Sequence, residues 1–124
     1  MSEYRSPIGD PLFTPDAPLL VRLGEVKISL QPEPGSYPTA AKAGGVQGDI
    51  LLEIWIDAEG NPTKVVALWG PNELREKAVE YGLRWKFKPF NLEGKPSPVR
   101  FRMPVPFSLR QGGPRVLMPP SWQF

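Results

Sequence analysis

The sequence predicts an α+β domain in which a small antiparallel sheet of three to four strands packs with one short and one long helix. Two alternating apolar patterns predict the sheet, a hairpin over residues 48–69 and a long strand over residues 99–109. Between them, residues 72–85 place apolar side chains at helical spacing. Proline-rich stretches at both ends predict extended arms on either side of the domain.

Chain length and proline spacing divide the chain into three parts. Its 124 residues suffice for one domain. Prolines recur every three or four residues from Pro7 to Pro18, a spacing that disfavours helix and suits an extended chain. We therefore predict a proline-rich N-terminal arm over residues 1–18, a folded domain over residues 19–109 and an extended C-terminal tail over residues 110–124.

The domain is expected to open with one or two strands over residues 19–30. Apolar residues alternate on both sides of Gly24 but in a shifted register, which indicates a bulge or a bend. A loop then leads to a short helix over residues 37–45. Pro38 fits the first helical position, and the glycine pair at residues 44–45 is expected to end the helix.

The clearest strand covers residues 48–56 and begins a hairpin. One face of this strand carries Ile50, Leu52, Ile54 and Ile56, and the other carries Leu51, Glu53 and Trp55. Residues 57–61 predict a tight turn, because Gly60 and Asn61 can take positive φ. Residues 63–69 then return as the second strand.

The main helix is predicted over residues 72–85, with Asn72 as its cap. One face of this helix is apolar, because four side chains follow one another at spacings of four, three and four: Leu74, Ala78, Tyr81 and Trp85. Residues 91–98 are expected to form a loop before the last strand.

The last strand, over residues 99–109, has one unbroken apolar face. Its other face carries Arg100, Arg102, Pro104, Pro106 and Ser108. Proline cannot donate a hydrogen bond to a ladder. Pro104 and Pro106 therefore predict an edge strand, or a strand that is paired over only part of its length.

The net charge of +2 hides an asymmetry along the chain. Residues 1–81 carry seven basic and twelve acidic side chains, whereas residues 82–124 carry eight basic and one acidic. The two parts either lie together and neutralise each other, or the second forms a basic face for an acidic protein or an anionic membrane surface. The second interpretation assigns partner binding to four arginines on the edge strand and basic face: Arg100, Arg102, Arg110 and Arg115. Nucleic acid is not expected, because no recognised binding motif accompanies the charge.

Apolar side chains in the two arms have no core of their own. They either fold back on the domain or anchor into a partner protein. We predict partner contacts for six of them: Tyr4, Ile8, Leu12, Phe13, Trp122 and Phe124.

The composition argues against catalysis. The chain has no cysteine and no histidine, which removes thiolate nucleophiles, zinc sites built from these residues and the usual general base. Turn chemistry explains Asp57 and Glu59, and no glycine-rich phosphate loop follows a strand. We expect no enzyme activity, no catalytic or metal site, no cofactor and no small-molecule substrate.

The order of motifs resembles the C-terminal domain family of TonB, the energy transducer. Tyr37-Pro38 resembles the opening of the family pattern, and residues 44–48 resemble its glycine-flanked entry to the first core strand. Residues 54–60 resemble the strand that ends in Asp-x-x-Gly, and residues 85–89 resemble the Trp-x-Phe-x-Pro after the long helix. The helix departs from the family pattern, because residues 74–78 keep only part of Leu-Asp-x-Ala-Ala.

Two functions are consistent with these observations. The favoured one is a non-enzymatic accessory subunit that binds other protein subunits and stabilises a larger membrane-associated complex, respiratory, secretory or photosynthetic. The alternative, implied by the resemblance, is energy transduction or receptor binding, in which an extended peptide adds to the strand over residues 99–109.

The expected location follows from the absence of targeting signals in the sequence. The chain shows no signal peptide and no apolar run long enough to span a bilayer, so we expect it to lack the transducers' membrane anchor. The expected location is the cytoplasmic side, peripheral to a membrane complex. The periplasm is expected instead if the sequence is part of a longer, anchored chain.

Overall fold

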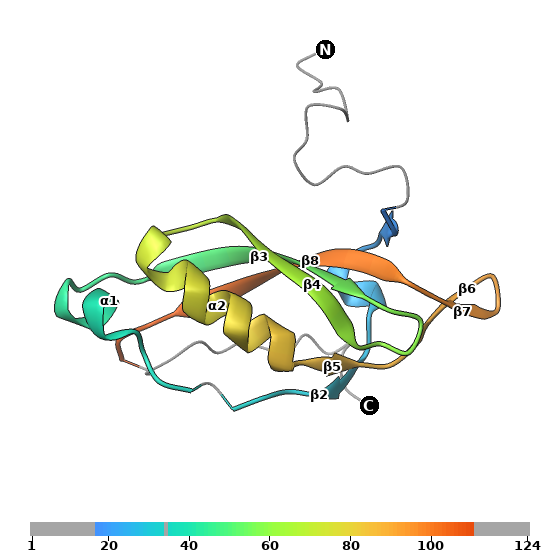
Figure 1. Cartoon of the computed structure of the whole chain (residues 1–124), viewed down its shortest axis with the longest axis horizontal. Coiled ribbons are helices and arrows are strands. Elements are labelled where there is room, and N and C mark those ends of the chain that lie inside the picture. The colour runs from blue at the N-terminus through green and yellow to red at the C-terminus, as the bar shows by residue number, and fades with distance from the viewer. Residues whose placement is uncertain (1–16, 34, 111–124) are drawn as a thin grey trace, which may run out of the picture.

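The computed structural model describes residues 17–33 and 35–110, which form an α+β domain (Figure 1). Its elements in chain order are β1 (Leu19–Leu20), the 3₁₀ helix η2 (Leu23–Glu25), β2 (Ile28–Leu30), α1 (Thr39–Ala43), β3 (Gly48–Ile56), β4 (Pro62–Trp69), α2 (Asn72–Arg84), β5 (Lys86–Phe87), β6 (Phe90–Leu92), β7 (Lys95–Ser97) and β8 (Val99–Phe107). The helix α1 and the β6–β7 hairpin lie at opposite ends of the domain (Figure 1). The predicted fold class is confirmed.

The main sheet has four strands in the order β1-β8-β3-β4. β8 runs antiparallel to β3 along their whole length, from Gly48 opposite Phe107 to Ile56 opposite Val99. β4 is antiparallel to β3, as the predicted hairpin requires. β1 differs from the expected antiparallel pattern, because it lies parallel to the start of β8, with Leu19 opposite Val99.

One face of the sheet carries the core. The alternating apolar residues of β3 and β8 are buried there: Ile50, Leu52, Ile54, Ile56, Val99, Phe101, Met103, Val105 and Phe107. Helix α2 covers β3 and β4 with the side chains that share its predicted apolar face, and Leu74, Ala78 and Tyr81 are fully buried. We call this side of the sheet the inner face and the opposite side the outer face.

A cluster of aromatic rings, Trp85, Phe87 and Phe101, completes the core at the C-terminal end of α2. β2 pairs antiparallel with β5. The Phe87 ring on β5 stacks on Trp85, with ring centroids 5.8 Å apart, and meets Phe101 of β8 edge-on at 5.0 Å. The short pair of strands therefore connects the end of α2 to the centre of the sheet.

Three local predictions about element ends differ from the structure. Pro38 was predicted to be the first residue of α1 but is its N-cap. Asn72 was predicted to cap α2 but is its first residue, and Pro71 is the N-cap. The predicted loop over residues 91–98 contains the β6–β7 hairpin. Positive φ at Glu93 (54°) and Gly94 (85°) gives the two-residue turn that matches the twist of paired strands.

Asp57 closes the β3–β4 turn as the sequence indicated. One of its carboxylate oxygens accepts hydrogen bonds from the backbone N–H groups of Glu59 and Asn61, both at 2.9 Å. These donors favour the charged form, so the Asn61 N–H above all lowers the pKa of Asp57 below its ordinary value of 3.8.

A lowered pKa makes the turn's contribution to stability depend on pH. A group with a lowered folded-state pKa stabilises the fold above its unfolded-state pKa, and this stabilisation is lost as the pH falls through the folded-state value. We expect Asp57→Asn, which keeps an acceptor oxygen but does not titrate, to melt below the wild type at pH 7. The gap in melting temperature should narrow below about pH 4. A gap that is constant from pH 7 to pH 2 would contradict the role given to the carboxylate charge.

Candidate functional site

The candidate site is the edge of β8 that faces away from β3, which we call the outer edge. β3 pairs with one side of β8 along its whole length, whereas β1 covers the other side only at Val99 and Arg100. Within the described ranges, the stretch from Arg102 to Phe107 has no strand partner on that side. Of the two structures predicted for this strand, partial pairing is the one observed.

The main-chain groups on this edge can be assigned from one hydrogen bond. The N–H of Val21 donates to the carbonyl of Arg100 at 2.8 Å, so the main-chain groups of Arg100 point toward β1. In a strand, N–H and C=O of one residue point to the same side and alternate from residue to residue. The groups of Arg102, Pro104 and Pro106 therefore point to the uncovered side.

The two prolines make this edge poor in donors. Pro104 and Pro106 have no N–H, so the uncovered edge offers the N–H of Arg102 and the carbonyls of Arg102 and both prolines. The two prolines do not weaken the β3–β8 ladder, because their backbone nitrogens point away from β3. The edge can therefore accept hydrogen bonds from an added strand but can return few.

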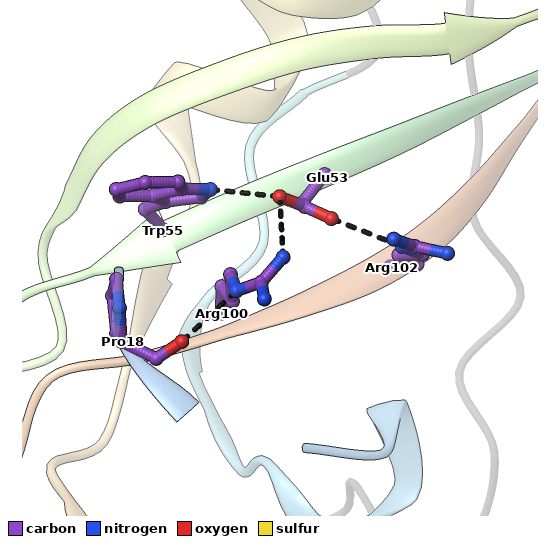
Figure 2. A network of polar contacts seen from close by, with 5 residues as sticks. All are labelled: Pro18, Glu53, Trp55, Arg100 and Arg102. Carbon is purple, nitrogen blue, oxygen red and sulfur yellow. Dashed lines mark hydrogen bonds and ion pairs between the residues drawn. The ribbon is translucent and has the colours of Figure 1, made fainter. Parts of the chain in front are cut away.

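A buried carboxylate lies on the outer face beside this edge (Figure 2). Glu53 of β3 is 0% exposed and accepts from the Trp55 indole N–H at 2.9 Å. Its oxygens also pair with Arg100 at 3.2 Å and with Arg102 at 3.0 Å. The antiparallel register produces this cluster, because Glu53 lies directly opposite Arg102 and Trp55 directly opposite Arg100.

The two predicted arginines of β8 have different environments. Arg100 also donates through Nε to the carbonyl of Pro18 at 2.9 Å, so it joins the start of β1 to the Glu53 cluster (Figure 2). Its side chain is 17% exposed, whereas that of Arg102 is 43% exposed. Among the described residues, Arg102 uses only Nε in a hydrogen bond, which leaves its terminal NH₂ groups open to a partner.

The outer face carries a surplus of positive charge. Lys64 of β4 lies over the Trp55 ring, 4.5 Å from its centroid. Arg100 and Arg102 pair with the Glu53 carboxylate, while Lys64 lies over the neighbouring Trp55. The other carboxylate on this face, Asp49, lies further along β3, opposite Pro106. Arg110 is exposed at the end of the described chain. The other predicted contact residues, Tyr4, Ile8, Leu12, Phe13, Arg115, Trp122 and Phe124, lie outside the described residues.

Glu53 is the member of this cluster that sequence reasoning did not single out. A signal was present, because an acid and a tryptophan alternate on one strand and two arginines alternate on another. The described residues contain no group of three or more potential ligands of the His, Cys, Asp and Glu types that could hold a metal ion. Within the same part of the chain, no helix has the length and apolar character needed to cross a membrane.

Comparison with known proteins gives a consistent result. The family model described as Gram-negative bacterial TonB protein C-terminal matches residues 33–109. Protein TonB of Vibrio cholerae serotype O1 is 37% identical over 84 residues, which cover 66% of this chain and 34% of that protein. Protein TonB of Xanthomonas campestris pv. campestris is 38% identical over 78 residues, which cover 61% of this chain and 35% of that protein.

One solved structure has a similar fold. The solution NMR structure of the Pseudomonas aeruginosa TonB CTD matches with a TM-score of 0.54 and 22% sequence identity, covering 72% of this chain and 93% of that one. At this identity the match concerns the fold alone. The chain spans about a third of the length of the curated relatives it matches.

The relatives correct one prediction and reorder another. The predicted cytoplasmic-side location is wrong, because TonB homologues are periplasmic and anchored in the inner membrane. The accessory-subunit interpretation, which was favoured from sequence, gains no support. The alternative, a TonB-like protein-binding and energy-transduction domain, agrees better with the comparisons. The expectation of a non-enzymatic protein agrees with a family of non-enzymatic transducers.

Proposed function

We propose a receptor-binding function for this chain, which belongs to the TonB C-terminal domain family. In this proposal, the domain binds an extended protein segment along the outer edge of β8. The observation that carries this proposal is that, among the described residues, the main chain from Arg102 to Phe107 has no strand partner on the side away from β3. Proteins commonly bind extended segments by adding a strand to such an edge. The proposed setting is the periplasm, with an outer-membrane receptor as the partner and with no catalytic step.

The geometry supports strand addition at β8. The antiparallel partner β3 pairs with the strand over all nine residues, from Val99 to Phe107, so β8 is already extended before a partner binds. The buried side chains of β8 anchor it to the core. A preformed template lowers the entropic cost of binding. Residues 19–109 are proposed to act as the folded unit, and the arms as supplementary contacts.

The proposal is tested by adding an extended segment of an outer-membrane receptor to the isotope-labelled full chain and recording backbone amide signals. Binding at β8 should shift the Arg102 amide and its neighbours on that strand. Shifts confined to β4, at the opposite edge of the sheet, would contradict the proposed site. A spectrum that stays unchanged at a high concentration of the receptor segment would contradict the proposed function itself.

Replacing Pro104 with alanine is expected to strengthen this binding. The substitution restores an outward N–H on the uncovered edge, and one additional hydrogen bond is worth about 1 kcal/mol. The dissociation constant for the receptor segment should therefore fall about fivefold in an isothermal titration. The matched control is Pro96→Ala in the β6–β7 hairpin, which removes an exposed proline outside the stretch from Arg102 to Phe107 and should leave the affinity unchanged. Equal or weaker binding by Pro104→Ala would argue against main-chain pairing at this position.

A further inference from the structure

Resting on the proposed function, we infer that the strand recognised by β8 carries an acidic side chain directly opposite Arg102. The partner chemistry is then an extended segment with a carboxylate at one defined register position. Strand addition alone would recognise only main chain. The inference adds a residue that determines specificity and the kind of side chain that it selects.

The main chain centres the pairing on Arg102. Arg100 is already engaged by β1, and the two prolines beyond Arg102 supply carbonyls but no donors. On the uncovered edge, Arg102 is therefore the residue of the described strand that can both donate and accept. An added strand makes its two-way hydrogen bonding there and only donates further along.

The side chain opposite Arg102 must point to the outer face. Residues directly opposite in a ladder project to the same face, and this holds for parallel and antiparallel neighbours alike. Arg102 projects to the outer face, where it meets Glu53 (Figure 2). The partner side chain at this position therefore lies beside the Arg102 guanidinium, whichever way the partner strand runs.

The charge of the outer face favours an acid at that position. The single carboxylate of Glu53 pairs with two arginines. Within the described ranges, Arg102 hydrogen-bonds through Nε, and its terminal NH₂ groups make no hydrogen bond. A partner carboxylate would accept from those groups and pair with the charge that Glu53 does not balance. A lysine there would face like charge directly across the ladder, which is unfavourable.

The experiment compares short synthetic peptides of alternating valine and threonine whose central residue is glutamate, glutamine or lysine. Each is titrated into the full chain, and binding is read from the β8 amide signals and from the dissociation constant. We expect the glutamate peptide to bind about threefold more tightly than the glutamine peptide, with lysine the weakest. The preference should fall with rising salt.

Three variants locate the preference. Arg102→Gln should bind the glutamate and glutamine peptides equally, because it removes the guanidinium charge that would pair with the peptide's carboxylate. Arg100 and Trp55 still hold Glu53 in this variant. Arg102→Lys, which keeps the charge, should retain a preference for glutamate. The matched control, Lys64→Gln, removes one positive charge from the same face but from β4, and should leave the preference unchanged.

The outcomes separate this inference from the function on which it rests. Equal binding of the three peptides at β8, failure of the glutamate peptide to shift the β8 amides, or a glutamate preference that survives Arg102→Gln would overturn the inference. The proposed function is decided separately by the receptor segment. If that segment shifts the β8 amides while the peptides show no preference, the edge binds main chain without selecting an acid.

Discussion

Replacing Gly60 with alanine is expected to lower the free energy of unfolding by about 4 kcal/mol or more. Gly60 has a φ of +92°, a conformation that residues with a Cβ rarely adopt. A Cβ at this position would lie 2.0 Å from the carbonyl oxygen of Phe87 and 2.7 Å from its carbonyl carbon. Both contacts are with backbone, so no side-chain rotation relieves them.

The backbone of Phe87 has little freedom to move away. Its N–H donates to the Gly60 carbonyl at 3.0 Å, and its ring is held between Trp85 and Phe101. The added methyl group must therefore separate the β3–β4 turn from β5 and loosen the aromatic packing behind it. A domain of this size should lose about 15 °C or more in melting temperature, measured by circular dichroism.

Gly94 supplies a matched control for the Gly60 substitution. It also has a positive φ, +85°, but a Cβ there would meet nothing within 4 Å. Gly94→Ala should therefore cost only backbone strain, about 1 kcal/mol. Similar melting temperatures for the two variants would show that φ, and not the contact with Phe87, dominates at Gly60.

Elements whose side chains follow a regular period were predictable from the sequence. Alternation over residues 48–56 and 99–107 predicts which apolar side chains of β3 and β8 are buried on the inner face, and the structure agrees at each of those positions. Glu53 is the exception on the outer face, because its ion pairs with β8 bury it there. The apolar face of α2 follows in the same way from helical spacing. In each case burial against one neighbouring layer decides the pattern, and burial is what periodicity reports.

Elements fixed by distant partners were not predictable. Residues 19–30 alternate like strands, yet β1 covers only Leu19–Leu20 and joins β8 in parallel, about eighty residues away along the chain. The β6–β7 hairpin was missed because its strands are short and exposed, and its turn uses Glu93 in a conformation more typical of glycine or asparagine. Local sequence carries little information about either choice.

The candidate site was predictable in part. The prolines correctly indicated that β8 is paired over only part of its length on one side within the described ranges, and Arg102 was among the predicted contact residues. Arg100 was assigned to the same role, but its guanidinium is occupied by Glu53 and by the Pro18 carbonyl. The pairing depends on the β3–β8 register, and a shift of one residue would place Glu53 on the other face.

Replacing Glu53 with alanine is the second substitution expected to have a large effect, about 3 kcal/mol of lost stability. The carboxylate is fully buried and accepts from Trp55, Arg100 and Arg102. Without it, two guanidinium groups face each other across a cavity, and the part-buried indole N–H of Trp55 loses its acceptor. The loss stays below that of a wholly buried pair because Arg102 can turn toward solvent.

Chemical denaturation of Glu53→Ala beside Glu80→Ala isolates the effect of burial. Glu80 is also paired, with Lys77 at 3.5 Å, but its side chain is 56% exposed, so its loss should change stability by about 0.5 kcal/mol or less. Glu53→Ala should also speed hydrogen exchange at the Val21 amide, because Arg100 loses one of the contacts that hold it beside β1. If the Val21 amide stays as protected as in the wild type, β1 is held by its main-chain pairing alone, and the Glu53 cluster stabilises the sheet without positioning the strand that limits the open edge.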